Sequence, residues 1–174
     1  FALDEDTAAG KPFYVINVLL KDMAELRGLL GENVSNRMLT DLAKELTEAA
    51  DRNVYYFSDA FRLILHSESE VEQKLPLIQR CFAGERTENN VRVGLTASYY
   101  VLECPKFAET IEDIQEQDAF LNRYVLPTMT NGQTVMVNDE IIRKFHRSIA
   151  VSNLVADALR HDGLEVFYQP IYDV

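Results

Sequence analysis

The sequence predicts an α/β fold in which helices flank a mixed sheet of five strands, followed by a long helix and one further strand. Residues 13–20 (FYVINVLL) form a nearly continuous apolar run, which is typical of a central strand buried on both faces. Apolar side chains at every fourth position from Val34 to Leu46 predict an amphipathic helix. Residues 54–57 and 60–66 predict two strands around a tight connection, which makes an antiparallel hairpin. Because helical crossovers can join parallel strands, the sheet is expected to be mixed.

The boundaries of the helices are predicted from capping and terminating residues. The amphipathic helix is expected to start at a cap on Asn33 or Ser35 and to stop at residues 52–53. A second helix is predicted over residues 69–82, ended by Gly84. The later pattern predicts a β-rich segment at 91–102, a helix introduced by Pro105, and a short strand at 134–137 after an Asn-Gly turn.

A long helix is predicted near the end of the chain, between Asn138, a good N-cap, and Gly163, a good terminator. Some two dozen residues would make it roughly 36 Å long at the standard helical rise. Its apolar residues follow 3-4 spacing, which is typical of either an interdomain connector or one half of a dimer contact. Residues 165–171 (EVFYQPI) then predict a strand that begins a further structural unit after the helix.

Two pairs of neighbouring tyrosines, Tyr55–Tyr56 and Tyr99–Tyr100, lie within strand-like segments. Successive side chains of a strand point to opposite faces of the sheet. We therefore expect one tyrosine of each pair in the core and the other outside.

Composition limits the classes of partner. The chain has 17 basic and 28 acidic residues, a formal net charge of −11, so it repels a polyanion on average and nucleic-acid binding is not expected. No apolar run reaches about eighteen residues, so no transmembrane helix is predicted and this fragment is not expected to contact a membrane. The chain starts at Phe1 rather than Met, so we expect a longer polypeptide, with any sensory or membrane-anchoring segment upstream.

The sequence predicts no metal ion and no other cofactor. Cys81 and Cys104 have neither metal-ligand spacing nor a disulfide framework, and both are expected to be small buried hydrophobic residues in a reducing, cytoplasmic setting. His66, His146 and His161 are far apart in sequence, and none pairs with a cysteine or carboxylate at ligand spacing.

Two stretches carry a family resemblance. Residues 137–140 (VNDE), the long helix after them and residues 165–171, with their Tyr-Gln-Pro-Ile, look like the connector and first strand of an EAL domain. Residues 56–65 (YFSDAFRLIL) fall where bacterial GGDEF domains place their signature hairpin. The resemblance implies a degenerate GGDEF domain over 1–137, a connector helix over 138–163 and the start of an EAL domain over 164–174.

The signature itself is altered. In the register of the resemblance, Phe57 and Ser58 replace the two glycines, Asp59 is retained, Ala60 replaces the glutamate, and Phe61 is retained. Glycine lets a phosphate approach the backbone closely, whereas a ring and a hydroxymethyl group stand in the way.

Other family positions have changed as well. Leu19 stands where the family has a metal-binding aspartate, Arg27 replaces a guanine-contacting asparagine, and Asn36 replaces a guanine-contacting aspartate. The product-inhibition motif, an arginine and an aspartate three apart, reads Glu-Ala-Ala-Asp at residues 48–51.

These changes predict that the fragment does not make cyclic di-GMP. Joining two GTP molecules is phosphoryl transfer, which needs metal ions to neutralise charge on the phosphates. Mg²⁺ is held by carboxylate oxygens, and both carboxylate positions, Leu19 and Ala60, are hydrocarbon here. The resemblance therefore implies a non-catalytic regulatory and dimerisation module that controls a downstream EAL domain, where any hydrolysis of cyclic di-GMP would reside.

An alternative is a vestigial sensor of GTP or cyclic di-GMP, with Asp22, Arg27, Asn36 and Asp59 as its binding residues. In the competing interpretation, these residues have only local structural roles. This interpretation makes Asp59 a turn former, Asp22 the N-cap of a helix and Asn36 an early helix residue, which are common roles for these residue types.

Overall fold

The computed structural model describes residues 11–57, 59–88, 90–161, 163 and 165. The chain divides into two compact units, with the boundary between Asn138 and Asp139. The first unit contains the whole sheet, and the second contains the long C-terminal helix.

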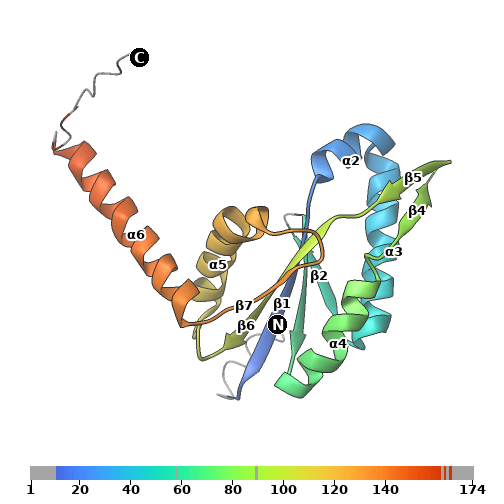
Figure 1. The fold of residues 1–174 in the computed structure, drawn as a ribbon, viewed down its shortest axis with the longest axis horizontal. Helices are drawn as coiled ribbons and strands as arrows, with labels where there is room; N and C mark the ends of the chain where they lie inside the picture. Colours follow the sequence, from blue (N-terminus) through green and yellow to red (C-terminus); the bar gives the residue numbers. More distant parts are fainter. Residues whose placement is uncertain (1–10, 58, 89, 162, 164, 166–174) are drawn as a thin grey trace, which may run out of the picture. The chain divides into compact units, whose positions relative to one another are not determined.

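The main sheet has five strands in the order β2-β3-β1-β6-β7 (Figure 1). The central strand β1 (Phe13–Leu20) lies between β3 (Ala60–Leu65) and β6 (Ala97–Cys104) and is antiparallel to both. The edge strand β2 (Val54–Phe57) is antiparallel to β3, and β7 (Thr134–Met136) is parallel to β6. The predicted mixed α/β fold, its five strands and its hairpin are confirmed.

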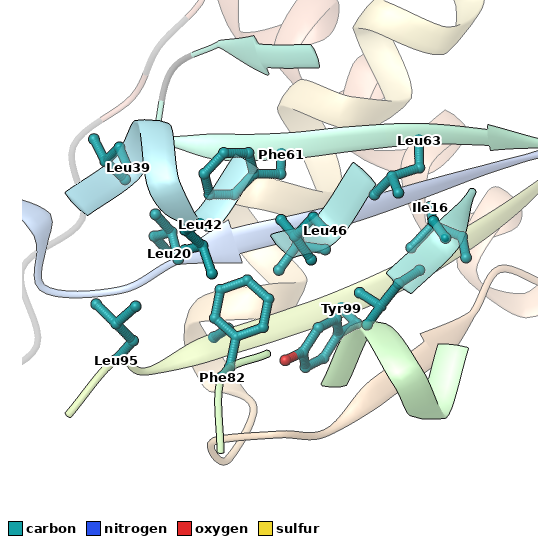
Figure 2. Close-up of a cluster of buried hydrophobic side chains, with 14 of the residues drawn as sticks. Ile16, Leu20, Leu39, Leu42, Leu46, Phe61, Leu63, Phe82, Leu95 and Tyr99 are labelled. Carbon is teal, nitrogen blue, oxygen red and sulfur yellow. The ribbon is translucent and has the colours of Figure 1, made fainter. Parts of the chain in front are cut away.

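Helices cover both faces of this sheet. Figure 1 shows α3 (Glu32–Ala50) and α4 (Glu68–Arg80) on one side and α5 (Ile111–Phe120) on the other. The main core lies under α3 and α4, where Leu42 and Leu46 meet Ile16 and other sheet residues (Figure 2). The predicted apolar stripe of this helix is therefore the surface that it buries.

The start of α3 differs from the prediction. Its N-cap is Gly31, with a positive φ of 77°, and Asn33 and Ser35 lie inside the helix. The glycine allows a second helix to begin directly after a short one, α2 (Met23–Leu30). The sequence indicated only a possible N-cap for α2, Asp22, because its eight residues bury only Met23 and form no apolar stripe. The helix ends at Ala50 with Asp51 as its C-cap, directly before the predicted stop at residues 52–53.

The β-rich segment 91–102 is two strands in different sheets. Strand β5 (Val91–Gly94) pairs with β4 (Glu85–Glu88) in a separate two-stranded ribbon, and only β6 joins the main sheet. The sequence ERTE of β4 gave no apolar signal. Its Arg86 donates two hydrogen bonds of 2.7 and 2.5 Å to Glu45 of α3, which attaches the ribbon to the helix.

The helix predicted after Pro105 begins six residues later than that proline. Thr110 accepts a hydrogen bond from the Asp113 backbone at 3.1 Å, and the Asp113 carboxylate accepts one from the Thr110 backbone at 2.9 Å. This reciprocal capping box fixes the start of α5 at Ile111.

The prediction that one tyrosine of each pair is buried and the other exposed is wrong for both pairs. Tyr55 and Tyr56 are 41% and 40% exposed, whereas Tyr99 and Tyr100 are 1% and 0% exposed. The reason is the position of each strand: β2 lies at the edge of the sheet, and β6 is an inner strand with helices over both faces.

The long helix is confirmed as α6 (Asp139–Arg160). Its first half buries Phe145, while Leu154 and Leu159 in its second half are 71% and 61% exposed. The strand predicted at 165–171 lies outside the described residues except for Glu165. No helix in the described part of the chain is long and apolar enough to cross a membrane.

Candidate functional site

The two positions where the resemblance places metal-binding carboxylates, and where this chain has hydrocarbon side chains, lie opposite each other in the sheet. Leu19 of β1 and Ala60 of β3 are register partners across the antiparallel pair. Next to this pair, the backbone N–H of Leu20 donates a hydrogen bond of 2.9 Å to the carbonyl of Asp59. Side chains directly opposite each other in a sheet have Cβ atoms about 5 Å apart, close enough for two carboxylates to share a cation. The fold thus forms the geometry for such a pair, with hydrocarbon in both places.

Asp59 occupies the tight turn between β2 and β3 in the left-handed conformation, with φ of 58°. Aspartate tolerates this conformation because its short polar side chain can bond locally. The structure therefore agrees with the turn-forming interpretation of this residue.

The carboxylate of Asp59 is already paired with a cation. Arg27 of α2 places Nη2 2.5 Å from Asp59 Oδ1 and Nη1 3.4 Å from Oδ2. Tyr56, on the other strand of the hairpin, donates its hydroxyl to Asp59 Oδ1 at 2.9 Å and accepts from Arg27 at 3.3 Å. We call these three residues the hairpin clasp.

The clasp changes the ionisation of its members. Burial alone would raise the pKa of Asp59, but hydrogen bonds from Arg27 and Tyr56 outweigh it and hold that pKa below its ordinary value. Burial, together with the hydrogen bond to Asp59, raises the pKa of Tyr56 to about 12. The hydrogen bond to Asp59 raises the pKa of Arg27 further. The clasp is therefore an anion held by a guanidinium and a neutral phenol at physiological pH.

Replacing Asp59 with Asn is expected to lower stability at neutral pH by about 1 kcal/mol or less, because the pair is more than one-third exposed. A carboxylate with a depressed pKa stabilises the fold above its unfolded pKa, and this contribution is lost as the pH falls through the folded value. The difference in unfolding free energy between the parent and Asp59→Asn chains should therefore shrink below about pH 4. Urea titrations from pH 7 to pH 3 measure it, and a constant difference would show that the clasp does not depend on the charge of Asp59.

The structure brings two of the four candidate binding residues together, Arg27 and Asp59. Asp22 is the N-cap residue of α2, as expected, although it is left-handed and its side chain makes no capping bond. It lines a hollow of about 510 Å³ between α2 and residues 92–96. Asn36 lies on the exposed side of α3, as expected for an early helix residue.

Tyr56 is the member of this site that the sequence analysis did not identify. The available signal was its spacing of three from Asp59 across a tight turn, which places both side chains near the same end of the hairpin. Lys21 was also missed. Its ammonium donates to the carbonyl of Met129 at 2.5 Å and joins the end of β1 to the segment before β7.

The residues present do not fit a magnesium site of the GGDEF type. Leu19 and Ala60 offer no oxygen, and the carboxylate of Asp59 is engaged by a guanidinium. Within the described residues, no group of three or more His, Cys, Asp or Glu side chains could hold a metal ion. Of the two cysteines, Cys104 is buried, as expected, and Cys81 is only partly buried.

The chain has the GGDEF fold. The GGDEF domain of YfiN (TpbB) from Pseudomonas aeruginosa is similar at TM-score 0.67 and 15% identity, covering 83% of this chain and 88% of that one. An EAL/GGDEF domain protein from M. capsulatus reaches 0.64 at 16% identity, with 78% and 94% covered. The active GGEEF domain of a diguanylate cyclase from Vibrio cholerae reaches 0.56 at 14% identity, with 79% and 90% covered.

No protein-family model matches the sequence, and no curated protein does. At identities this low, similarity to the solved domains establishes the fold. The chemistry of this chain has to be argued from its own residues.

Proposed function

We propose that this chain is a non-catalytic regulatory and dimerisation module of a bacterial cyclic di-GMP signalling protein, acting on a downstream EAL phosphodiesterase domain in the cytoplasm. The observation that carries the proposal is the pairing of Leu19 with Ala60 inside an otherwise complete GGDEF fold. The core and the hairpin of that fold are present, while the positions that the resemblance aligns with the family's metal ligands carry hydrocarbon.

The hairpin clasp supports the same conclusion. The phosphoryl transfer of a diguanylate cyclase depends on cations that neutralise the phosphates. Here the one acidic side chain of the altered signature, Asp59, is neutralised by Arg27. A cation at this place would first have to displace the guanidinium, so the clasp substitutes an internal ion pair for a metal site.

The helix α6 supports the regulatory part of the proposal. Its second half exposes Val151, Leu154, Val155 and Leu159, from 43% to 71% of each side chain. Exposed apolar side chains repeated along one helix are typical of a surface that another element covers. Both a connector to an EAL domain and a dimer contact use such a surface.

The proposal predicts that the purified chain forms no cyclic di-GMP from GTP and Mg²⁺. The reaction is followed by chromatography of the nucleotides, with an active GGEEF domain assayed in parallel as the positive control. The physical reason for the expected result is the absence of carboxylate oxygens at Leu19 and Ala60. Turnover of GTP by this chain above the uncatalysed rate would refute the non-catalytic role.

A second candidate function, a nucleotide sensor, is favoured by one observation. The hollow beside Asp22 is lined by Lys21 and Arg92, whose cations are the groups that could contact a phosphate, and by the carboxylates of Asp22 and Glu25. Isothermal titration with GTP and with cyclic di-GMP, each with Mg²⁺, separates the two functions. Heat of binding that is lost on substitution of Asp22, Asn36 or Asp59 would establish the sensor function. Absence of any heat of binding would support the regulatory module instead.

A further inference from the structure

The face of the sheet that α5 covers carries an unusual row of polar side chains. Asn17 of β1 is the register partner of Arg62 on β3 and of Tyr100 on β6. Asp118 of α5 accepts hydrogen bonds from both neighbours, at 2.6 Å from the Tyr100 hydroxyl and at a shorter distance from Arg62. The guanidinium and the carboxylate balance each other, so the row has no net charge.

Two buried polar atoms on this face have no hydrogen-bond partner among the described residues. Asn17 is completely buried and donates its amide nitrogen to Asn122 Oδ1 at 3.3 Å. Its own oxygen, Asn17 Oδ1, has no hydrogen-bond partner among the described residues, and neither has Ser98 Oγ two residues before Tyr100. Buried polar atoms are almost always paired, so unpaired ones need a physical explanation. A carboxylate offers about four acceptor positions, and two of those on Asp118 are used.

A cavity of about 620 Å³ adjoins the row, between the β2–β3 hairpin and α5. Arg62, Asp118 and Asn122 are among its polar lining residues, and Phe57, Ile114 and Ala119 are among its apolar ones. Phe57 is 67% exposed, and the Arg62 guanidinium lies over its ring at 5.6 Å from the centroid. An exposed ring beside a stacked guanidinium offers a flat surface to another ring.

We propose that this cavity is a binding site for a neutral, planar heteroaromatic ligand that stacks on Phe57 and donates an N–H to the Asp118 carboxylate. The neutral row disfavours a strongly charged ligand, and the unused acceptor positions of the Asp118 carboxylate favour one with an N–H donor. The site lies between the hairpin and α5 and is distinct from the hollow beside Asp22. It is independent of whether the chain regulates an EAL domain.

The test uses indole as the probe and benzofuran, which replaces the N–H by oxygen, as its matched control. Both are titrated into the ¹⁵N-labelled full chain, and backbone amide shifts are followed. Indole is expected to shift residues 115–122 saturably and to bind about fivefold more tightly than benzofuran, since one hydrogen bond is worth roughly that ratio.

Three variants locate the binding. Ala119→Leu fills the cavity from an exposed helical position and should abolish the shifts, while Glu116→Leu, on the same helix outside the cavity lining, should leave them unchanged. Phe57→Ala should weaken indole binding by removing the stacking ring. Equal binding of the two probes, shifts that survive Ala119→Leu, or no saturation with indole would each overturn the proposal.

Discussion

Replacing Leu19 with Asp and Ala60 with Glu in the same chain is expected to lower the free energy of unfolding by about 3–5 kcal/mol in the absence of divalent cations. Ala60 is completely buried, and its register partner Leu19 is half-buried, so the two new carboxylates would face each other with little water. Two like charges in such a place repel each other, and their desolvation is costly.

Mg²⁺ should return part of this stability, because a cation between the two carboxylates binds the folded chain only. At ten times its dissociation constant, a ligand of the folded state adds about 1.4 kcal/mol. Urea unfolding of the double variant with and without Mg²⁺ measures the effect. The Leu19→Asn, Ala60→Gln chain is the matched control, since its amides have similar shape and no charge. If Mg²⁺ stabilises both variants equally, Leu19 and Ala60 do not occupy the positions of a lost metal site.

Replacing Phe61 with Ala is expected to destabilise the chain by about 3–5 kcal/mol, the usual cost of truncating a buried phenylalanine. Phe61 is retained from the family signature, and in this structure it is completely buried between the sheet and α3 (Figure 2). Its ring centroid is 4.9 Å from that of Tyr56, so it also supports a member of the hairpin clasp. We therefore expect that the signature phenylalanine is kept for packing.

Phe57→Ala is the matched control for this experiment. Phe57 lies in the same hairpin, but 67% of its side chain is exposed, and its removal should change stability by about 0.5 kcal/mol or less. Chemical denaturation of the three chains gives both values. A loss at Phe57 as large as that at Phe61 would contradict the exposure of the Phe57 side chain and show that its ring is packed in the folded chain.

The altered signature separates two roles that the GGDEF fold combines. Burial of Phe61 and the turn at Asp59 preserve the shape of the hairpin. Under the proposed function, the hydrocarbon pair Leu19 and Ala60 and the ion pair of Asp59 with Arg27 lie where the resemblance places the family's chemistry. Shape depends on apolar contacts and turn geometry, so the hairpin can form without metal ligands.

The sequence by itself determined the order and type of most elements, because those depend on local patterns. The apolar run of β1, the repeat from Met38 to Leu46 and the Asn-Gly turn before β7 each lie within a few residues. Local patterns also identified Asp59 as a turn residue. They indicated only the N-cap of α2, at Asp22, and missed β4, since both elements are short and bury few apolar side chains.

Only the tertiary structure decided which residues meet. The pairing of Leu19 with Ala60, the contact of Arg27 with Asp59 across 32 residues, and the burial of both Tyr99 and Tyr100 depend on strand order and on which helix covers which face. The polar row under α5 joins residues as far apart as Asn17 and Asn122 for the same reason. Sequence periodicity records which side of its own element a residue faces, whereas its partners are set by how the elements pack.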